Sequence, residues 1–319
     1  MSLESFSTAG LPADLVESLP CPVCDAPGPG RTLVPACYPP GLTRDALKAL
    51  YSASSDRTLL DRLAQCEGCG LVYLDPRVRR EVILEAYTEA EDPTFIAQNP
   101  MRIRTFGRSL RVLSRRFPEL GPGRRVLDVG CAGGAFPKAA ADFGHRVTGI
   151  EPSRWLVAAA RAAYGLDIRQ GSLEDQDFGG ERFELITLWD VLEHLTDPRA
   201  TLTRLRDLLR EGGLLVVTFP DHGSLARRLL GRRWPFFLSV HLYYFTLATL
   251  RRMLDRLGFA TLWSGPYWQT LETGYVLRRA AHEFPPFGWA ERGVASLGLS
   301  RVPLTYTIGQ SLLVARKTS

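Results

Sequence analysis

The sequence predicts an α/β protein with a doubly wound, mostly parallel sheet and a small cysteine-bearing module before it. From Arg125 onward, apolar strand-like runs alternate with amphipathic helical runs, the order typical of a parallel sheet covered on both faces. Before residue 75 the chain instead carries two Cys-x-x-Cys pairs and a segment rich in Pro and Gly. These two observations separate the chain into unlike parts.

Elements are expected in the following order. A helix over 79–90 precedes an amphipathic helix over 100–117, and Gly121-Pro122-Gly123 ends this part. Sheet strands are expected at 125–129, 145–150, 166–169, 183–188 and 214–219, with late strands near 260–264 and 309–315. Helices between them are expected at 135–143, at 153–164, from 197 to the stop at Gly212-Gly213, and at 246–257.

The helix over 100–117 has two different faces. Ile103, Phe106, Leu110, Leu113 and Phe117 form its apolar side, and Arg104, Arg108, Arg111 and Arg115 form the other. We expect the arginine side to face solvent.

Composition excludes several classes of protein. The 319 residues are 45% hydrophobic and 23% charged, which is typical of globular proteins and not of disordered or fibrous ones. No apolar run approaches the roughly 18 residues that a membrane span needs. The first residues include Glu4 and Asp14 and lack a basic stretch, so they do not resemble a secretory signal. We therefore expect a cytoplasmic protein.

The charge balance is weakly basic. Net charge is +5, and Lys48, Lys138 and Lys317 are the only lysines among 39 basic residues. Genomic base composition explains this arginine bias most simply. A charge of +5 on this length is a weak argument for a nucleic-acid partner.

Residues 126–134, which read VLDVGCAGG, predict a ligand site. A strand here runs into a glycine turn and then a helix, so a ligand can approach the backbone and meet free helix N–H groups. Asp128 lies within the strand end, and Glu151 ends the next strand, where a carboxylate can accept hydrogen bonds from two ribose hydroxyls. Parallel strands open a ligand crevice at this edge of such a sheet.

Four motifs resemble those of the class I S-adenosylmethionine (SAM)-dependent methyltransferases. VLDVGCAGG matches the first motif, GIEPS at 149–153 the acidic second-strand motif, GSLED at 171–175 the adenine-binding turn, and LITLWDVLEHLTDP at 185–198 the fourth-strand motif. The resemblance covers about residues 120–319. It implies a Rossmann-like methyltransferase fold and SAM as cofactor.

The resemblance also implies which residues hold SAM. Asp128 and the 130–134 turn would hold the methionine moiety, Glu151 the ribose, and Leu173 with its neighbours the adenine. The full expected set is Asp128, Gly130, Cys131, Ala132, Gly134, Glu151, Pro152, Ser172, Leu173, Asp190 and Val191. Ala132 replaces the family's usual middle glycine. Ser172 stands where the family often has Asp, which leaves Glu174 and Asp175 as alternative adenine contacts.

The cysteine pairs predict a structural zinc site. Cys21, Cys24, Cys66 and Cys69 supply four thiolates, enough for a closed tetrahedral site, and four sulfurs leave no open position for catalysis. A redox role is the alternative. The 41 residues between the pairs are more than an ordinary zinc ribbon has, and Cys37 is expected to be a bystander. The segment resembles zinc-binding N-terminal modules fused to methyltransferases of sugar, glycan and natural-product pathways.

Two histidines are candidate bases for methyl transfer. His194 follows the fourth strand, and His241 opens the segment HLYYFT after the fifth. Either could take a proton from the acceptor, because histidine titrates near neutral pH. A structural hydrogen bond is the alternative for His194. Tyr244 is a candidate either for the pocket wall or for the core, and Asp221 and His222 are weaker candidates.

Arginines and aromatic residues are interleaved over 225–237, which reads LARRLLGRRWPFF. This segment is either a helix with a solvated arginine face or a lid for an anionic or lipid-linked substrate. We expect a zinc-binding module over 1–95, a helical connector over 96–124, and a methyltransferase domain over 125–319. The substrate cap is expected around 222–246 and 268–305.

The leading interpretation is an enzyme that methylates a small molecule, such as a sugar, glycan or natural-product intermediate, on oxygen or carbon by direct SN2 transfer. An RNA methyltransferase with a zinc module is the first alternative. The absence of a recognisable RNA-binding motif argues against it. The second alternative is a non-catalytic scaffold, although the intact Asp128 and Glu151 argue against that. The sequence does not indicate an oligomeric state.

Overall fold

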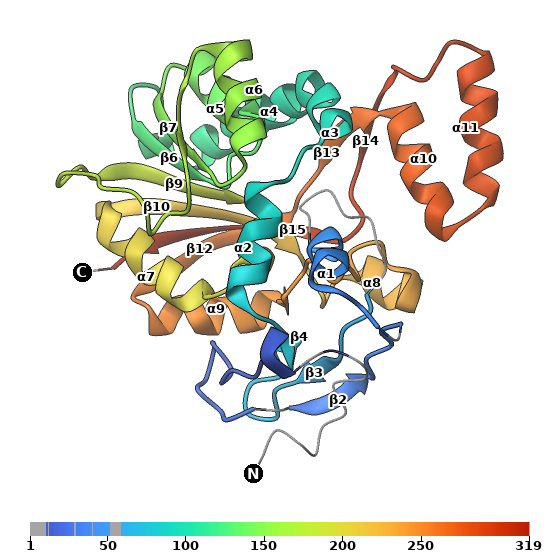
Figure 1. The fold of residues 1–319 in the computed structure, drawn as a ribbon. Coiled ribbons are helices and arrows are strands. Elements are labelled where there is room, and N and C mark those ends of the chain that lie inside the picture. Colours follow the sequence, from blue (N-terminus) through green and yellow to red (C-terminus); the bar gives the residue numbers. More distant parts are fainter. Residues whose placement is uncertain (1–10, 12, 29, 40, 52–58, 319) are drawn as a thin grey trace.

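The computed structural model describes residue 11 and residues 13–28, 30–39, 41–51 and 59–318 (Figure 1). Residues 1–10 lie outside this part. Two expectations concern these residues and lie outside the described part: the absence of a secretory signal and the start of the module over 1–95.

Within the described residues, seven strands form the central sheet in the order β12-β15-β10-β9-β6-β7-β8. The strands are β6 (Arg125–Val129), β7 (Arg146–Glu151), β8 (Asp167–Gln170), β9 (Phe183–Trp189), β10 (Leu209–Pro220), β12 (Phe259–Pro266) and β15 (Gln310–Lys317). β15 runs antiparallel to β10 and β12, and the other neighbouring strands are parallel. The chain moves outward from β6 to β8 and then returns to the other side of β6 with β9. This reversal opens a crevice at the carboxyl ends of β6 and β9.

Helices cover both faces of the central sheet (Figure 1). They are α4 (Asn99–Arg116), α5 (Ala135–Asp142) and α6 (Arg154–Tyr164) on one face, and α7 (Pro198–Leu208) and α9 (Leu247–Arg256) on the other. Successive strand residues point to opposite faces, so Val126 packs with Leu110 and Phe136, whereas Leu127 belongs to the core that contains Leu205 and Leu250. Every expected strand and helix of this part is present within a few residues of its predicted bounds.

One expected boundary is wrong. Gly212-Gly213 were expected to stop a helix before a strand at 214, but β10 already begins at Leu209 and runs through both glycines. The pairing of β10 with β9 shifts between Leu209 and Leu214, and Gly212 has φ +72°. The glycines therefore form a bulge inside the strand rather than a loop before it.

The cysteine-bearing part forms its own small sheet in the order β11-β4-β3-β2. Its strands are β2 (Arg31–Val34), β3 (Leu63–Gln65), β4 (Val72–Leu74) and β11 (Tyr243–Tyr244). A separate pair joins β1 (Val16–Glu17) to β5 (Arg77–Val78). The helices here are α1 (Arg44–Leu50), α2 (Arg80–Thr88) and α3 (Pro93–Ala97). Because β11 comes from the segment that follows β10, this sheet joins parts of the chain that are about 170 residues apart.

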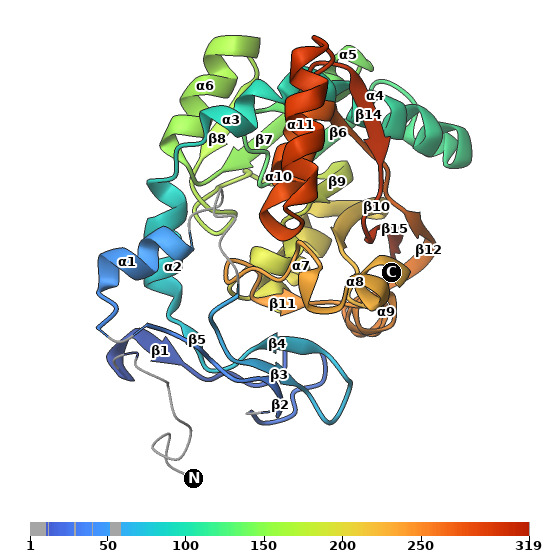
Figure 2. The ribbon, with the colours of Figure 1, turned by 90° about the vertical axis from the view of Figure 1, so that its right-hand side faces the viewer.

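A helical hairpin projects from the body of the molecule (Figures 1 and 2). It consists of α10 (Thr273–Glu283) and α11 (Pro286–Ser296), and lies between the paired strands β13 (Gln269–Glu272) and β14 (Pro303–Tyr306). α8 (Leu225–Leu230) covers only the start of the 225–237 segment. The 3-10 turns are η2 (Ala13–Leu15), η3 (Pro118–Leu120), η4 (Leu192–His194) and η5 (Gly231–Arg233).

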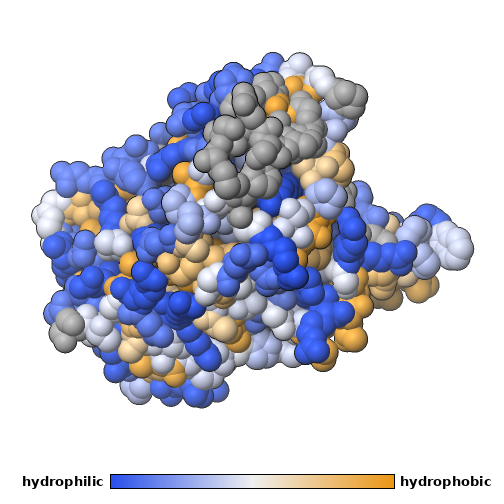
Figure 3. Space-filling model, turned by 90° about the horizontal axis from the view of Figure 1, so that it is seen from below, coloured by the Kyte–Doolittle hydropathy of each residue, from blue (hydrophilic) through white to orange (hydrophobic). Residues whose placement is uncertain are grey.

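The end of the molecule that carries the cysteine-bearing sheet presents a mostly hydrophilic surface with scattered hydrophobic residues (Figure 3). None of the helices in the described ranges is both long and apolar enough to cross a membrane.

Candidate active site

The glycine turn joins β6 to α5 at the crevice. Gly130 and Gly134 have φ values of +71° and +76°, in the left-handed region that favours glycine. A Cβ atom on Gly130 would lie 2.6 Å from a methyl carbon of Val191. Ala132 also has a positive φ, +45°, so the alanine that replaces the family's glycine holds a glycine-like conformation. The backbone of the turn therefore lies close to Val191, in the loop that follows β9.

Two adjoining cavities open beside this turn, one of about 430 Å³ and one of about 60 Å³. The larger is lined by the predicted cofactor residues Gly130, Ala132, Glu151, Pro152, Ser172, Leu173, Asp190 and Val191. The smaller is lined by Asp128, Gly130, Cys131, Ala132 and Asp190. Gly134 lines neither cavity, and a Cβ atom on it would lie 3.0 Å from Cβ of Ala160, which places it in the packing of α5 on α6. The structure thus gathers nearly all of the predicted set around one connected space.

Glu151 lies at the end of β7 with its carboxylate held by backbone. The N–H groups of Ala132 and Ser153 donate to it at 2.9 and 2.8 Å. Burial raises the pKa of this carboxyl to about 7, although both hydrogen bonds oppose the rise. The Glu151 carboxyl group on the cavity wall therefore changes its charge near neutral pH.

Asp128 is also buried, and the Thr187 hydroxyl donates to it at 2.6 Å. Burial raises the pKa of Asp128 well above its usual range, and the charge of Glu151 raises it further. The two acidic groups therefore share one enclosed wall, a poor environment for two negative charges and a favourable one for a cationic ligand.

Arg102 is a site residue that the sequence patterns did not indicate. It lies on α4 and lines both cavities, and its guanidinium group stacks over the Phe95 ring at 3.7 Å from the ring centre. Its Nε atom is buried without a hydrogen-bond partner, and no carboxylate of the described chain lies within ion-pair distance of it. Arg102 lies four residues before Phe106, on the apolar side of the 100–117 helix. The other arginines named for this helix lie on its opposite side, and this difference was the one feature of the sequence that could have indicated a role for Arg102.

His194 and His241 meet on the other side of the larger cavity. Their rings lie 4.7 Å apart, although they are far apart in the sequence. The Nδ1 atom of His194 lies 2.6 Å from the Tyr87 hydroxyl and 3.1 Å from the Val240 carbonyl oxygen. The Nδ1 atom of His241 lies 2.8 Å from the Phe236 carbonyl oxygen. A carbonyl only accepts, so Nδ1 of His241 carries the proton and Nε2 is left as the basic nitrogen.

Burial keeps both histidines neutral. It lowers the pKa of His194 to about 4 and holds the pKa of His241 well below its usual range. Glu193 lies beside them with both carboxylate oxygens buried and without a hydrogen-bond partner, and its Oε1 atom is 3.9 Å from Nε2 of His194. Burial raises the pKa of Glu193 well above normal. The third predicted catalytic residue lies elsewhere: the Tyr244 hydroxyl donates to the Leu238 carbonyl at 2.9 Å, and the residue is packed in the core rather than on the cavity wall.

Residues before the central sheet supply part of the cavity wall. Tyr87 comes from α2 and Phe95 from α3. Arg77 fastens this part to the loop after β9, because its guanidinium group donates to the Thr196 carbonyl and the Tyr243 hydroxyl, each at 2.7 Å. The backbone N–H of Leu242 donates to the Glu193 carbonyl at 2.8 Å. The cavity is therefore closed by segments that lie before and after the strands β6 and β9 in the sequence.

The four paired cysteines form a compact cluster. The Sγ atoms of Cys21 and Cys69 lie 3.5 Å apart, those of Cys24 and Cys66 lie 3.4 Å apart, and all four sulfurs lie within 4.8 Å of one another. A tetrahedral zinc with bonds of about 2.3 Å needs sulfurs roughly 3.8 Å apart, so the cluster fits this metal. Burial acts to raise the pKa of Cys66, but hydrogen bonds, including those from the backbone of Cys69 and Gly68, outweigh it and lower the pKa. Burial raises the pKa values of Cys21 and Cys69. Cys37 is exposed and stands outside the cluster.

Comparisons with known proteins find a family whose model matches about half of the chain. Residues 101–263 match the family described as "Methyltransferase domain". The chain is 34% identical over 119 residues to a ubiquinone biosynthesis O-methyltransferase of Cereibacter sphaeroides (strain ATCC 17025 / ATH 2.4.3), covering 35% of this chain and 48% of that protein. It is 38% identical over 105 residues to the protein of that name from Xanthomonas campestris pv. campestris (strain B100), covering 30% and 43%. The chain thus spans about half the length of the curated relatives it matches.

Similar solved structures include a putative methyltransferase from Bacillus halodurans C-125. Its TM-score is 0.48 at 18% identity, and the match covers 66% of this chain and all of that one. Magnesium protoporphyrin IX methyltransferase from Synechocystis PCC 6803 with bound SAM has a TM-score of 0.43 at 16% identity, covering 73% and 88%. The segment that matches the methyltransferase domain is just over half of the 319 residues. The chain therefore belongs to the methyltransferase-domain family.

Proposed function

We propose that the protein transfers a methyl group from SAM to a small-molecule acceptor, on oxygen or carbon, by direct displacement. The observation that carries the proposal is the cavity at the ends of β6, β7 and β9, whose wall combines the glycine turn, Glu151 and Arg102. When bound there, SAM supplies an electrophilic methyl group on a positively charged sulfur. Two relatives named as O-methyltransferases support oxygen as the acceptor atom.

The residues of this wall suit the three parts of SAM. Glu151 would accept hydrogen bonds from the ribose hydroxyls. Arg102 would pair with the methionine carboxylate, because its buried Nε lacks a partner. The paired acids Asp128 and Glu151 would favour the cationic end of the cofactor. Ser172 and Leu173 would meet the adenine.

Of the two alternative adenine contacts, we favour Glu174. It lines the larger cavity. The Asp175 carboxylate instead accepts hydrogen bonds from the backbone N–H and hydroxyl of Ser172, at 2.7 and 2.8 Å, and so holds the turn.

We propose that His241 or His194 accepts the proton of the acceptor. Both line the cavity, and both stay neutral at physiological pH because their pKa values are lowered. Nε2 of His241 is left free by the hydrogen bond at Nδ1. Tyr87 would orient His194 through its hydroxyl.

We propose the division into a module over 1–95, a connector over 96–124 and a catalytic domain over 125–319. The cap would comprise 222–246, which contributes Phe236 and His241 to the cavity, and 268–305, which contributes Arg278 and Arg279. The charge of these arginines favours an anionic acceptor, such as a sugar nucleotide, although Arg278 also forms an ion pair with Glu291. The cysteine cluster would hold a structural zinc.

The decisive experiment uses methyl-deuterated SAM. The purified protein is incubated with it and with fractionated lysate of its source, and the label is followed by mass spectrometry. We expect label in a small polar molecule. Label in RNA, or failure of the protein to bind SAM in calorimetry, would overturn the proposal.

A further inference from the structure

A second hollow lies on the outer surface of α4, and the proposed reaction makes no use of it. Its volume is about 500 Å³. We call it the α4 hollow. It is lined by Ile103, Arg104, Gly107, Arg108, Arg111, Ala139, Asp142, Phe143, Thr270, Pro303 and Thr305. The arginine side of α4, expected to be a plain solvated face, thus forms part of a concave surface.

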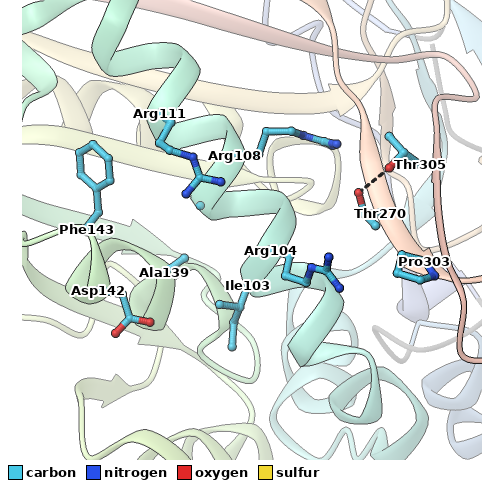
Figure 4. A pocket seen from close by; sticks show the side chains of 11 residues that line it. Ile103, Arg104, Arg108, Arg111, Ala139, Asp142, Phe143, Thr270, Pro303 and Thr305 are labelled. Atoms are coloured by element: carbon cyan, nitrogen blue, oxygen red, sulfur yellow. Dashed lines mark hydrogen bonds between the residues drawn. The ribbon is translucent and has the colours of Figure 1, made fainter.

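Three arginines give the α4 hollow its charge. Arg104, Arg108 and Arg111 lie four and seven residues apart, which places them on one side of α4 over about 10 Å of its length. Arg104 and Arg108 extend toward Thr305 and Pro303 on the β13–β14 pair (Figure 4). No carboxylate in the described ranges pairs with any of the three.

The single acid of the hollow does not neutralise them. Asp142 forms an ion pair with Lys138, one turn before it on α5. The Arg108 guanidinium group donates a hydrogen bond of 2.8 Å to the Trp268 carbonyl, which fixes its orientation. Its other N–H groups remain available for a ligand. The hollow is therefore a concave surface with excess positive charge and fixed donors.

The rest of the wall is apolar or neutral. Ile103, Phe143 and Pro303 offer carbon surface, and the Thr270 and Thr305 hydroxyls lie 2.9 Å apart. Guanidinium groups on successive turns match adjacent phosphate groups, since each can bind phosphate through two N–H groups. We propose that the α4 hollow binds a small ligand with two adjacent phosphate groups and an organic part that packs on the carbon surface.

This site is distinct from the cofactor cavity. Arg102 and Phe106 line the cofactor cavities from α4, whereas Arg104 and Arg108 line the hollow. Thr270 lines the hollow and the smaller cofactor cavity, and its backbone N–H donates to the Thr105 hydroxyl at 2.8 Å. The two sites therefore lie back to back across α4 and β13.

The test is calorimetric titration of the whole protein with pyrophosphate, with orthophosphate as the single-group comparison. The variant is Arg104→Gln with Arg111→Gln, because neither side chain makes a hydrogen bond or ion pair with the described chain. The control is Arg115→Gln with Arg154→Gln, which removes equal charge at exposed sites outside the hollow. Unchanged thermal melting verifies the fold of both.

We expect saturable one-to-one binding that is tighter for pyrophosphate than for orthophosphate. The hollow variant should weaken it at least about tenfold and the control less than about twofold. Saturating S-adenosylhomocysteine should leave the affinity unchanged. The proposal is overturned by non-saturable binding, by equal affinity for both anions, by equal losses in the two double variants, or by competition with S-adenosylhomocysteine. The last two comparisons separate a built site from general attraction and from binding at Arg102.

Discussion

At the scale of single residues, the site contains several buried ionisable groups, and burial has shifted their pKa values. Glu151 and Asp128 have raised pKa values, and His194 and His241 have lowered ones. The positions of Asp128 and Glu151 were predictable because both end strands. Their hydrogen bonds and pKa shifts were not, because these depend on what encloses them.

Glu151 should make SAM binding depend on pH. Its pKa lies near 7, so the carboxylate that would accept from the ribose is lost as pH falls from 8 to 6, and the dissociation constant should rise. Glu151→Gln should weaken SAM about tenfold or more and remove most of this dependence. Calorimetry at pH 6, 7 and 8 measures both effects, and a variant that keeps the full dependence would rule out Glu151 as its source.

The same group has the opposite effect on the free protein. Its pKa is raised from 4.5 to about 7 on folding, so its contribution to stability is complete below pH 4.5 and is lost as pH rises through 7. Other buried acids of the site add to this trend.

The Arg102→Gln variant should show which part of the cofactor Arg102 contacts. Loss of a charged hydrogen bond to the methionine carboxylate should weaken SAM and S-adenosylhomocysteine about 10–100-fold and leave adenosine binding unchanged. Arg115→Gln, on the same helix but exposed, is the control. If adenosine is weakened equally, Arg102 shapes the cavity rather than pairing with the carboxylate.

Replacing the catalytic base should lower turnover about 100-fold or more while SAM affinity stays near that of the wild type. His194→Asn and His241→Asn are compared with His222→Asn, a histidine whose pKa is also lowered to about 4 but which lies outside the cavity lining. Near-normal turnover in both cavity variants would exclude a histidine base.

At the scale of elements, the periodicity of apolar residues predicted those strands and helices that have their own local sequence pattern. The strands and helices of the central sheet alternate in the sequence, and each has its own apolar pattern, so β6 and α5 could be read directly. β11 has only two residues, and its partner β4 lies about 170 residues earlier, so no local signal marks it. α10 and α11 bury few of their own side chains.

Gly130, in the turn between β6 and α5, has a matched control in Gly165, at the C-terminal cap of α6. Gly130 and Gly165 both have positive φ, at +71° and +64°, but a Cβ meets Val191 at 2.6 Å in the first and nothing within 4 Å in the second. Gly165→Ala should cost about 1–2 kcal/mol of unfolding free energy from backbone strain alone. Gly130→Ala should cost roughly 1–3 kcal/mol more from overpacking and should abolish SAM binding.

Urea unfolding of both variants measures this difference. Adding Val191→Ala to Gly130→Ala should restore part of the lost stability, because it removes the methyl groups in contact. Equal costs at the two glycines would show that the close approach at Val191 is not a constraint.

At the scale of the whole molecule, segments far apart in the sequence are joined around one cavity. The cysteine-bearing sheet includes β11, which directly follows His241 of the cavity lining and Leu242, whose backbone N–H donates to the Glu193 carbonyl. Sequence reasoning placed the cysteines in a separate module because their composition differs. It could not show that this module and the loop after β10 share a sheet.

Removing the metal should therefore affect catalysis at a distance. Cys66→Ser should lose one equivalent of zinc, measured by atomic emission, lower the melting temperature by about 10 °C or more, and reduce turnover. Cys37→Ser, at an exposed cysteine outside the cluster, should change none of these. Zinc retained at full stoichiometry in Cys66→Ser would exclude the four-cysteine site.

The pairing of β11 with β4 also has a consequence for biosynthesis. While the ribosome is still making the second half of the chain, β4 presents an unpaired edge, because Tyr243 and Tyr244 have not yet emerged. The N-terminal sheet can be completed only after most of the catalytic domain has been translated. We therefore expect the nascent chain to depend on early metal capture or on chaperones to keep this edge from pairing with other chains.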